Sequence, residues 1–157
     1  PYHTARPKLL METFPEAKFV HIHRHPYEVF PSLCHTMRKV MGAFGVQRLD
    51  ESKLEDFAIE TYRRLYTAYF AQVGEIPAGR LHDISYEQLS ARPLETLEET
   101  YAALGLPDFE TVRPTMQGYL AEVSSYERNK YPELSPETKE RLKSEWRPMF
   151  EAWGYQP

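Results

Sequence analysis

The sequence has few cysteines and no long apolar run, and each absence excludes a class of protein. Its 157 residues include one cysteine, Cys34, which excludes an intrachain disulfide framework and a zinc site built on cysteines. No apolar run approaches the roughly 20 residues that a membrane-spanning helix requires. The first residues also lack the apolar core of a signal peptide. Together with the single thiol, these absences predict a cytoplasmic protein. The Golgi lumen is the alternative if a segment before Pro1 carries an anchor.

The sequence also lacks an excess of positive charge. Nineteen lysines and arginines stand against 23 acidic residues, for a net charge of -4, so no global field draws the protein to nucleic acid or to an anionic membrane. A local cluster of cations would have to hold any anionic ligand. A composition of 41% hydrophobic and 27% charged residues is typical of a globular domain with a core. The length predicts one domain or most of one.

A short strand followed by an arginine is the clearest local feature. Lys18–His23 is rich in aromatic and β-branched residues and is predicted to be a strand. Pro26 then opens a helix that we expect to run toward Met41. Arg24 therefore follows a strand end, where ligands bind in α/β folds. Its planar fork of donors suits a phosphate, and Ser32 in the helix can add a hydroxyl. The alternative is an arginine paired with a carboxylate and a solvated serine.

Helices dominate the rest of the chain. Apolar periodicity predicts a long helix over 52–73, a second strand over 81–84, and helices over 94–104 and 108–121. The third of these helices should be interrupted near Arg113 and Pro114. One last helix starts at Ser135. Few strands among many helices predict part of an α/β three-layer domain with a parallel sheet, whose other strands lie outside this chain.

The segment from Phe14 to Pro26 resembles the PAPS-dependent sulfotransferase family. It has a Phe-Pro-x-Ala-Lys lead-in, a strand, an arginine, a proline two residues on and a serine eight residues after the arginine. The resemblance implies that Arg24 and Ser32 bind the 3′-phosphate of 3′-phosphoadenosine 5′-phosphosulfate (PAPS), a co-substrate used without a metal. His25 departs from the family, which often has aspartate or asparagine there.

Two further segments are similar to the same family. Ser85–Leu89, followed by Arg92-Pro93 and Leu104–Pro107, implies that Tyr86 lies near the adenine, and an aromatic face can stack on a purine. A core tyrosine is the alternative. The stretch 126–132 stands where the family has a basic loop that closes over the 3′-phosphate, which implies roles for Arg128 and Lys130. A solvated charged loop is the alternative.

The histidines include a candidate catalytic base and candidate metal ligands. Pro1-Tyr2-His3 resembles the end of the family's Lys-x-Pro-x-His stretch, which makes His3 the candidate catalytic base. Histidine suits this task because its ordinary pKa is near neutral. A disordered chain start is the alternative. His21 and His23 share a strand face, but no further ligand stands at metal-binding spacing, so a packed or surface role is expected.

The family's glycine-containing loop for the 5′-phosphosulfate has no counterpart among the seven glycines. We therefore expect residues 1–157 to be the C-terminal portion of a single P-loop-like sulfotransferase domain. A missing N-terminal segment or a second polypeptide would supply the loop. The resemblance implies transfer of a sulfuryl group from PAPS to a hydroxyl or amine of a small-molecule or carbohydrate acceptor. The alternatives are a non-catalytic nucleotide-binding or scaffold remnant, and a P-loop kinase-like protein, which would need a lysine loop and magnesium carboxylates.

Overall fold

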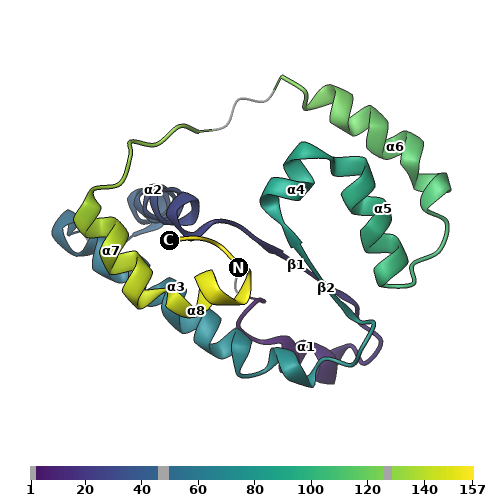
Figure 1. Cartoon of the computed structure of the whole chain (residues 1–157), viewed down its shortest axis with the longest axis horizontal. Helices are drawn as coiled ribbons and strands as arrows, with labels where there is room; N and C mark the ends of the chain where they lie inside the picture. The colour runs from purple at the N-terminus through teal and green to yellow at the C-terminus, as the bar shows by residue number, and fades with distance from the viewer. Residues whose placement is uncertain (1–2, 46–49, 126–128) are drawn as a thin grey trace. The chain divides into compact units, whose positions relative to one another are not determined.

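A computed structural model describes residues 3–45, 50–125 and 129–157 (Figure 1). The chain divides into two compact units. The strand unit comprises Pro7–His23 and Gln72–Lys130, and the helical unit comprises Pro1–Arg6, Arg24–Ala71 and Tyr131–Pro157. Among the described residues, no helix is long and apolar enough to cross a membrane.

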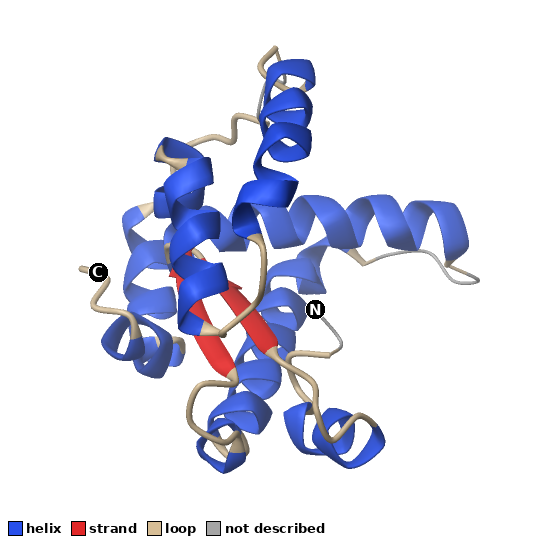
Figure 2. Ribbon diagram, turned by 90° about the vertical axis from the view of Figure 1, so that its right-hand side faces the viewer, coloured by secondary structure: helices blue, strands red, loops and turns tan. Residues whose placement is uncertain are grey.

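The strand unit is built on two parallel strands that lie side by side (Figure 2). β1 (Phe19–His23) pairs with β2 (Leu81–Ser85) in a register that runs from Phe19 opposite Leu81 to His23 opposite Ser85. The strand ends therefore come at the same edge of the pair. The helical elements of this unit are α1 (Pro7–Thr13), η2 (Val73–Glu75), α4 (Tyr86–Ala91), α5 (Pro93–Ala103) and α6 (Phe109–Glu122). Both predicted strands and their parallel pairing are confirmed, and the fold is a helix-rich α/β fold.

The helical unit packs its elements around one tryptophan. Its elements are α2 (Pro26–Phe44), η1 (Glu51–Lys53), α3 (Leu54–Phe70), α7 (Pro136–Glu145) and α8 (Arg147–Ala152). The Trp146 side chain is fully buried, and its Nε1 donates a hydrogen bond to the Ile59 carbonyl at 3.0 Å. The ring centroid of Tyr62 lies 4.2 Å from that of Trp146, so α3 and the α7–α8 segment share one core.

Two helix predictions need correction. α6 continues through Pro114, where an interruption was expected. Arg113 pairs with Glu110 at 2.7 Å and with Glu98 at 3.0 Å, and these contacts hold the first turn in place beside the proline. Asp108 stands at the N-cap position, but with φ 57° its side chain makes no capping hydrogen bond.

The last predicted helix is two helices. α7 ends at Glu145, Trp146 lies between the two, and α8 begins at Arg147. Pro148 accounts for the break, because it has no N–H to continue the hydrogen-bond ladder of α7 but fits the first turn of a new helix.

Candidate functional site

The junction of β1 and α2 positions Arg24. His23 ends β1 and Pro26 is the first residue of α2, so Arg24 lies in the two-residue connection between them. Its side chain is 30% exposed, and Nη2 donates to Glu28 Oε2 at 3.0 Å. The guanidinium is thus held at the start of α2 but is still accessible to solvent.

Arg24, Glu28 and Ser32 follow one another at intervals of four residues. Residues spaced by four lie on one face of a helix, so Glu28 and Ser32 share a face of α2, and the ion pair draws Arg24 to the same face. Ser32 is half-buried, and its carbonyl accepts a hydrogen bond from Thr36 Oγ1 at 2.9 Å. The guanidinium of Arg24 just before a 19-residue helix and the hydroxyl of Ser32 in its second turn offer donors near the positive end of that helix.

His25 caps α2, which accounts for its departure from the family pattern. Its Nδ1 accepts the Tyr27 backbone N–H at 3.2 Å, the bond that an aspartate or asparagine N-cap would accept. Its Nε2 lies 3.1 Å from the Gln156 carbonyl, to which it can only donate. The substitution is visible in the sequence, whereas nothing in the order of residues indicates the second bond.

In the strand unit, Tyr86 is the first residue of α4. Ser85 ends β2 and accepts the Gln88 N–H at 3.0 Å, and the Gln88 side chain accepts the Ser85 N–H at 3.3 Å, which forms a capping box. Tyr86 is half-buried directly after this cap. It therefore follows one strand end as Arg24 follows the other.

His3 and Lys130 lie in loops. His3 is exposed, and its carbonyl accepts the Arg6 N–H at 3.1 Å in the turn before α1. Lys130 is exposed outside any helix or strand. Arg128 lies outside the described residues.

A cross-strand side-chain contact joins two residues that were not predicted to meet. His21 Nδ1 lies 2.7 Å from Asp83 Oδ1, and His21 is 9% exposed. These two residues are register partners, which sequence spacing could not predict, because the partner strand lies 62 positions away. Burial lowers the pKa of the neighbouring His23, and the charge of His21 lowers it further, against the opposing effects of Asp83 and Glu87. Within the described ranges, no three side chains come together as a metal site.

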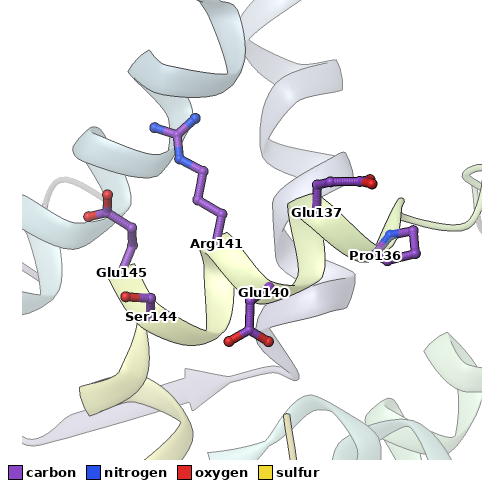
Figure 3. A pocket seen from close by; sticks show the side chains of 6 residues that line it. All are labelled: Pro136, Glu137, Glu140, Arg141, Ser144 and Glu145. Atoms are coloured by element: carbon purple, nitrogen blue, oxygen red, sulfur yellow. The ribbon is translucent and has the colours of Figure 1, made fainter.

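Two other features, a buried thiol and a surface depression, are unsuited to serve as a nucleophile and as a nucleotide site. Burial raises the pKa of the Cys34 thiol to about 11, so it is protonated at neutral pH and a poor nucleophile. A surface depression on α7 (Figure 3) is lined by Pro136, Glu137, Glu140, Arg141, Ser144 and Glu145. Its arginine already pairs with Asp56 at 2.6 Å, and the three carboxylates would repel an anionic nucleotide.

Comparison with known proteins assigns the family. The model of the family described as "Sulfotransferase family" matches residues 1–111. Omega-hydroxy-beta-dihydromenaquinone-9 sulfotransferase Stf3 from Mycobacterium bovis is 34% identical over 155 residues, as is its counterpart from Mycobacterium tuberculosis. Each alignment covers 99% of this chain, which spans 40% of the relative's length.

The fold has a solved counterpart. The crystal structure of sulfotransferase STF9 from Mycobacterium avium matches with a TM-score of 0.79 and 21% identity, covering 97% of this chain and 40% of that chain. At this identity the match establishes the fold alone, and the family model over residues 1–111 establishes the family. The chain belongs to the sulfotransferase family.

Proposed function

We propose that the protein to which this chain belongs transfers a sulfuryl group from PAPS to a hydroxyl acceptor. The observation that carries the proposal is the arrangement of Arg24, Glu28 and Ser32 where β1 ends and α2 begins, in a member of the sulfotransferase family. A bidentate guanidinium with a nearby hydroxyl is a physically good partner for a phosphate monoester.

Five of the predicted residues bind the nucleotide in this proposal. Arg24 and Ser32 bind the 3′-phosphate, and Tyr86 lies against the adenine. Arg128 and Lys130 belong to a basic loop that closes over the 3′-phosphate. Tyr86 suits this role because the Ser85–Gln88 capping box fixes the start of α4 that carries it, and an aromatic ring can stack on a base.

His3 is the catalytic base of the proposal. The acceptor oxygen forms a bond to sulfur while the bond from sulfur to the bridging oxygen of the 5′-phosphate breaks. The acceptor proton passes to His3, and adenosine 3′,5′-bisphosphate leaves with the electron pair of the broken bond. The exposure of the His3 side chain is compatible with contact to a substrate.

Residues 1–157 form the C-terminal portion of one sulfotransferase-like domain in this proposal. The chain spans 40% of its relatives' length, so the rest of the protein has room for the loop that binds the 5′-phosphosulfate. The acceptor is a hydroxyl on an apolar small molecule rather than an amine or a carbohydrate. Its support is the name of the Stf3 relatives, which states an omega-hydroxylated dihydromenaquinone.

The test is a transfer assay on the full-length protein. The protein is incubated with PAPS labelled in the sulfuryl group and with matched hydroxyl-terminated and amine-terminated isoprenoid lipids. We expect labelled sulfate esters from the hydroxylated compounds and a large loss of product formation in Arg24→Ala at limiting PAPS. Labelled product from the amine series alone would refute the acceptor assignment. An absence of transfer to every acceptor, without binding of PAPS, would refute the proposed function.

A further inference from the structure

His25 is held in one tautomer by two different hydrogen bonds. Nδ1 accepts the Tyr27 N–H, so it carries no proton, and Nε2 donates to the Gln156 carbonyl, so it carries one. A carboxylate could accept from Tyr27 but could not donate to a carbonyl. An asparagine could also cap the helix, but its side chain is too short to span both partners. Histidine is therefore suited to join the start of α2 to a segment 131 positions away.

The segment that His25 reaches is turned back by a glycine. α8 ends in a Schellman motif, in which the Tyr155 N–H donates to the Phe150 carbonyl at 3.0 Å and the Gly154 N–H to the Glu151 carbonyl at 3.4 Å. Gly154 has φ +67°, a conformation that glycine adopts without strain. This turn carries Tyr155 and Gln156 away from the axis of α8 and to His25.

Aromatic contacts complete the connection within the helical unit. The His25 ring centroid lies 5.0 Å from that of Tyr155 and 5.8 Å from that of Phe150. Tyr27 contacts Phe150 at 5.2 Å, and its hydroxyl donates to the Lys139 carbonyl at 3.2 Å. Burial raises the pKa of Tyr27, so this hydroxyl keeps its proton. The first turn of α2 is thus fixed by α7, by α8 and by the residues after α8.

We propose that His25, Tyr155 and the Gln156 carbonyl form a clamp that positions Arg24 for the 3′-phosphate. The inference rests on the proposed function and adds His25 as a positioning residue for that site. Arg24 precedes His25 directly in the chain, so the clamped cap fixes the backbone next to Arg24 within the helical unit. Fixing the backbone before the nucleotide binds reduces the ordering cost of binding.

Titration calorimetry measures the affinities of two nucleotides for variants of the full-length protein. Adenosine 3′,5′-bisphosphate reports the 3′-phosphate site, and adenosine 5′-monophosphate is the reference without that phosphate. His25→Asn keeps a good N-cap and removes the bond to Gln156. Tyr155→Ala removes the ring contact. Gln156→Ala is the matched control, because it keeps the backbone carbonyl.

We expect His25→Asn and Tyr155→Ala each to weaken binding of the bisphosphate by about 2- to 13-fold, the effect of losing one neutral hydrogen bond or a contact of similar strength. Both of these variants should bind the monophosphate with unchanged affinity. The control variant Gln156→Ala should bind both nucleotides with unchanged affinity. The double variant should lose little more than either single variant, because both act on one clamp. A general loss of folding would lower the active fraction without changing the ratio of the two affinities.

Arg24→Ala separates failure of this inference from failure of the proposed function. If Arg24→Ala abolishes the preference for the bisphosphate while His25→Asn keeps it, the clamp does not position Arg24 and the inference is wrong. If Arg24→Ala also keeps the preference, Arg24 does not bind the 3′-phosphate, and both the assignment and the clamp fail. His25→Asn alone decides the matter if Tyr155→Ala does not fold.

Discussion

Single residues carry the chemistry proposed for this chain, and their surroundings differ sharply. Arg24 and His25 are adjacent, yet one is salt-bridged to Glu28 and partly solvated, and the other is fixed by backbone bonds and rings. The sequence predicted Arg24 because a strand end and a serine eight residues on are visible in the order of residues. It could not predict the role of His25, which depends on a carbonyl 131 positions away.

His3 is the residue whose role is tested most sharply by kinetics. In the full-length protein, His3→Ala should lower kcat by roughly 10²–10⁴, the usual contribution of general acid–base catalysis, with nucleotide affinity almost unchanged. Ser32→Ala is the matched contrast and should weaken nucleotide binding with less effect on kcat. Normal kcat of His3→Ala at saturating substrates would place the base elsewhere and leave the family unaffected.

His23 should make the fold sensitive to mild acid. Burial and the charge of His21 lower its pKa in the folded state below the usual value of about 6.5, so the unfolded chain binds a proton more readily. Stability should therefore fall as the pH drops through about 6.5 and level off below the folded-state pKa. Urea unfolding of the chain at pH 7.5 and 5.5 measures this loss. His23→Asn should reduce it, and the matched variant His82→Asn on β2 should not. An identical loss in His23→Asn would contradict the account.

At the scale of elements, hydrophobic periodicity predicted most strands and helices, whereas the positions of two prolines did not predict where a helix is interrupted. Both strands and most helices were predicted, because hydrophobic spacing and caps such as Ser135 are local signals. Pro114 was expected to interrupt α6 and does not, whereas Pro148 divides the last helix and was not expected to. The two prolines differ through tertiary contacts, such as the burial of Trp146 at the break, which sequence spacing does not reveal.

Two glycines in different elements should respond to the same substitution with opposite signs. Gly118 lies inside α6, and a Cβ added there would meet no heavy atom within 4 Å, so Gly118→Ala should stabilise the chain by about 0.5–1 kcal/mol. Gly154 has φ +67° at the end of α8, so Gly154→Ala should destabilise it by about 1 kcal/mol. Denaturant unfolding measures both. Equal effects of the same sign would contradict these two backbone conformations.

At the scale of the whole molecule, the chain matches only part of the length of its relatives. The chain spans 40% of their length, and on β1 the apolar side chains of Val20 and Ile22 are 46% and 49% exposed. The family was recognisable from the sequence because the segment from Phe14 to Pro26, which resembles that family, falls inside this chain. The acceptor could not be predicted from the sequence, because nothing in residues 1–157 indicates its chemistry.

The isolated chain should therefore have no measurable sulfuryl transfer. The sequence predicts that the glycine loop for the 5′-phosphosulfate lies outside these residues, so charge developing on the leaving phosphate would lack preorganised donors in this chain alone. The purified 157-residue chain, incubated with labelled PAPS and an acceptor that the full-length protein uses, is the assay. Turnover by this chain without a second polypeptide would contradict the division of the site.

The central claim is that Arg24 and Ser32 of this chain bind the 3′-phosphate of the nucleotide. Calorimetric titration of the full-length protein with adenosine 3′,5′-bisphosphate and with adenosine 5′-monophosphate tests it most directly. We predict much tighter binding of the bisphosphate, a preference reduced by on the order of 1.5–3 kcal/mol in Arg24→Ala, as expected for a charged hydrogen bond. Equal affinity of the unmodified protein for the two nucleotides would contradict the claim.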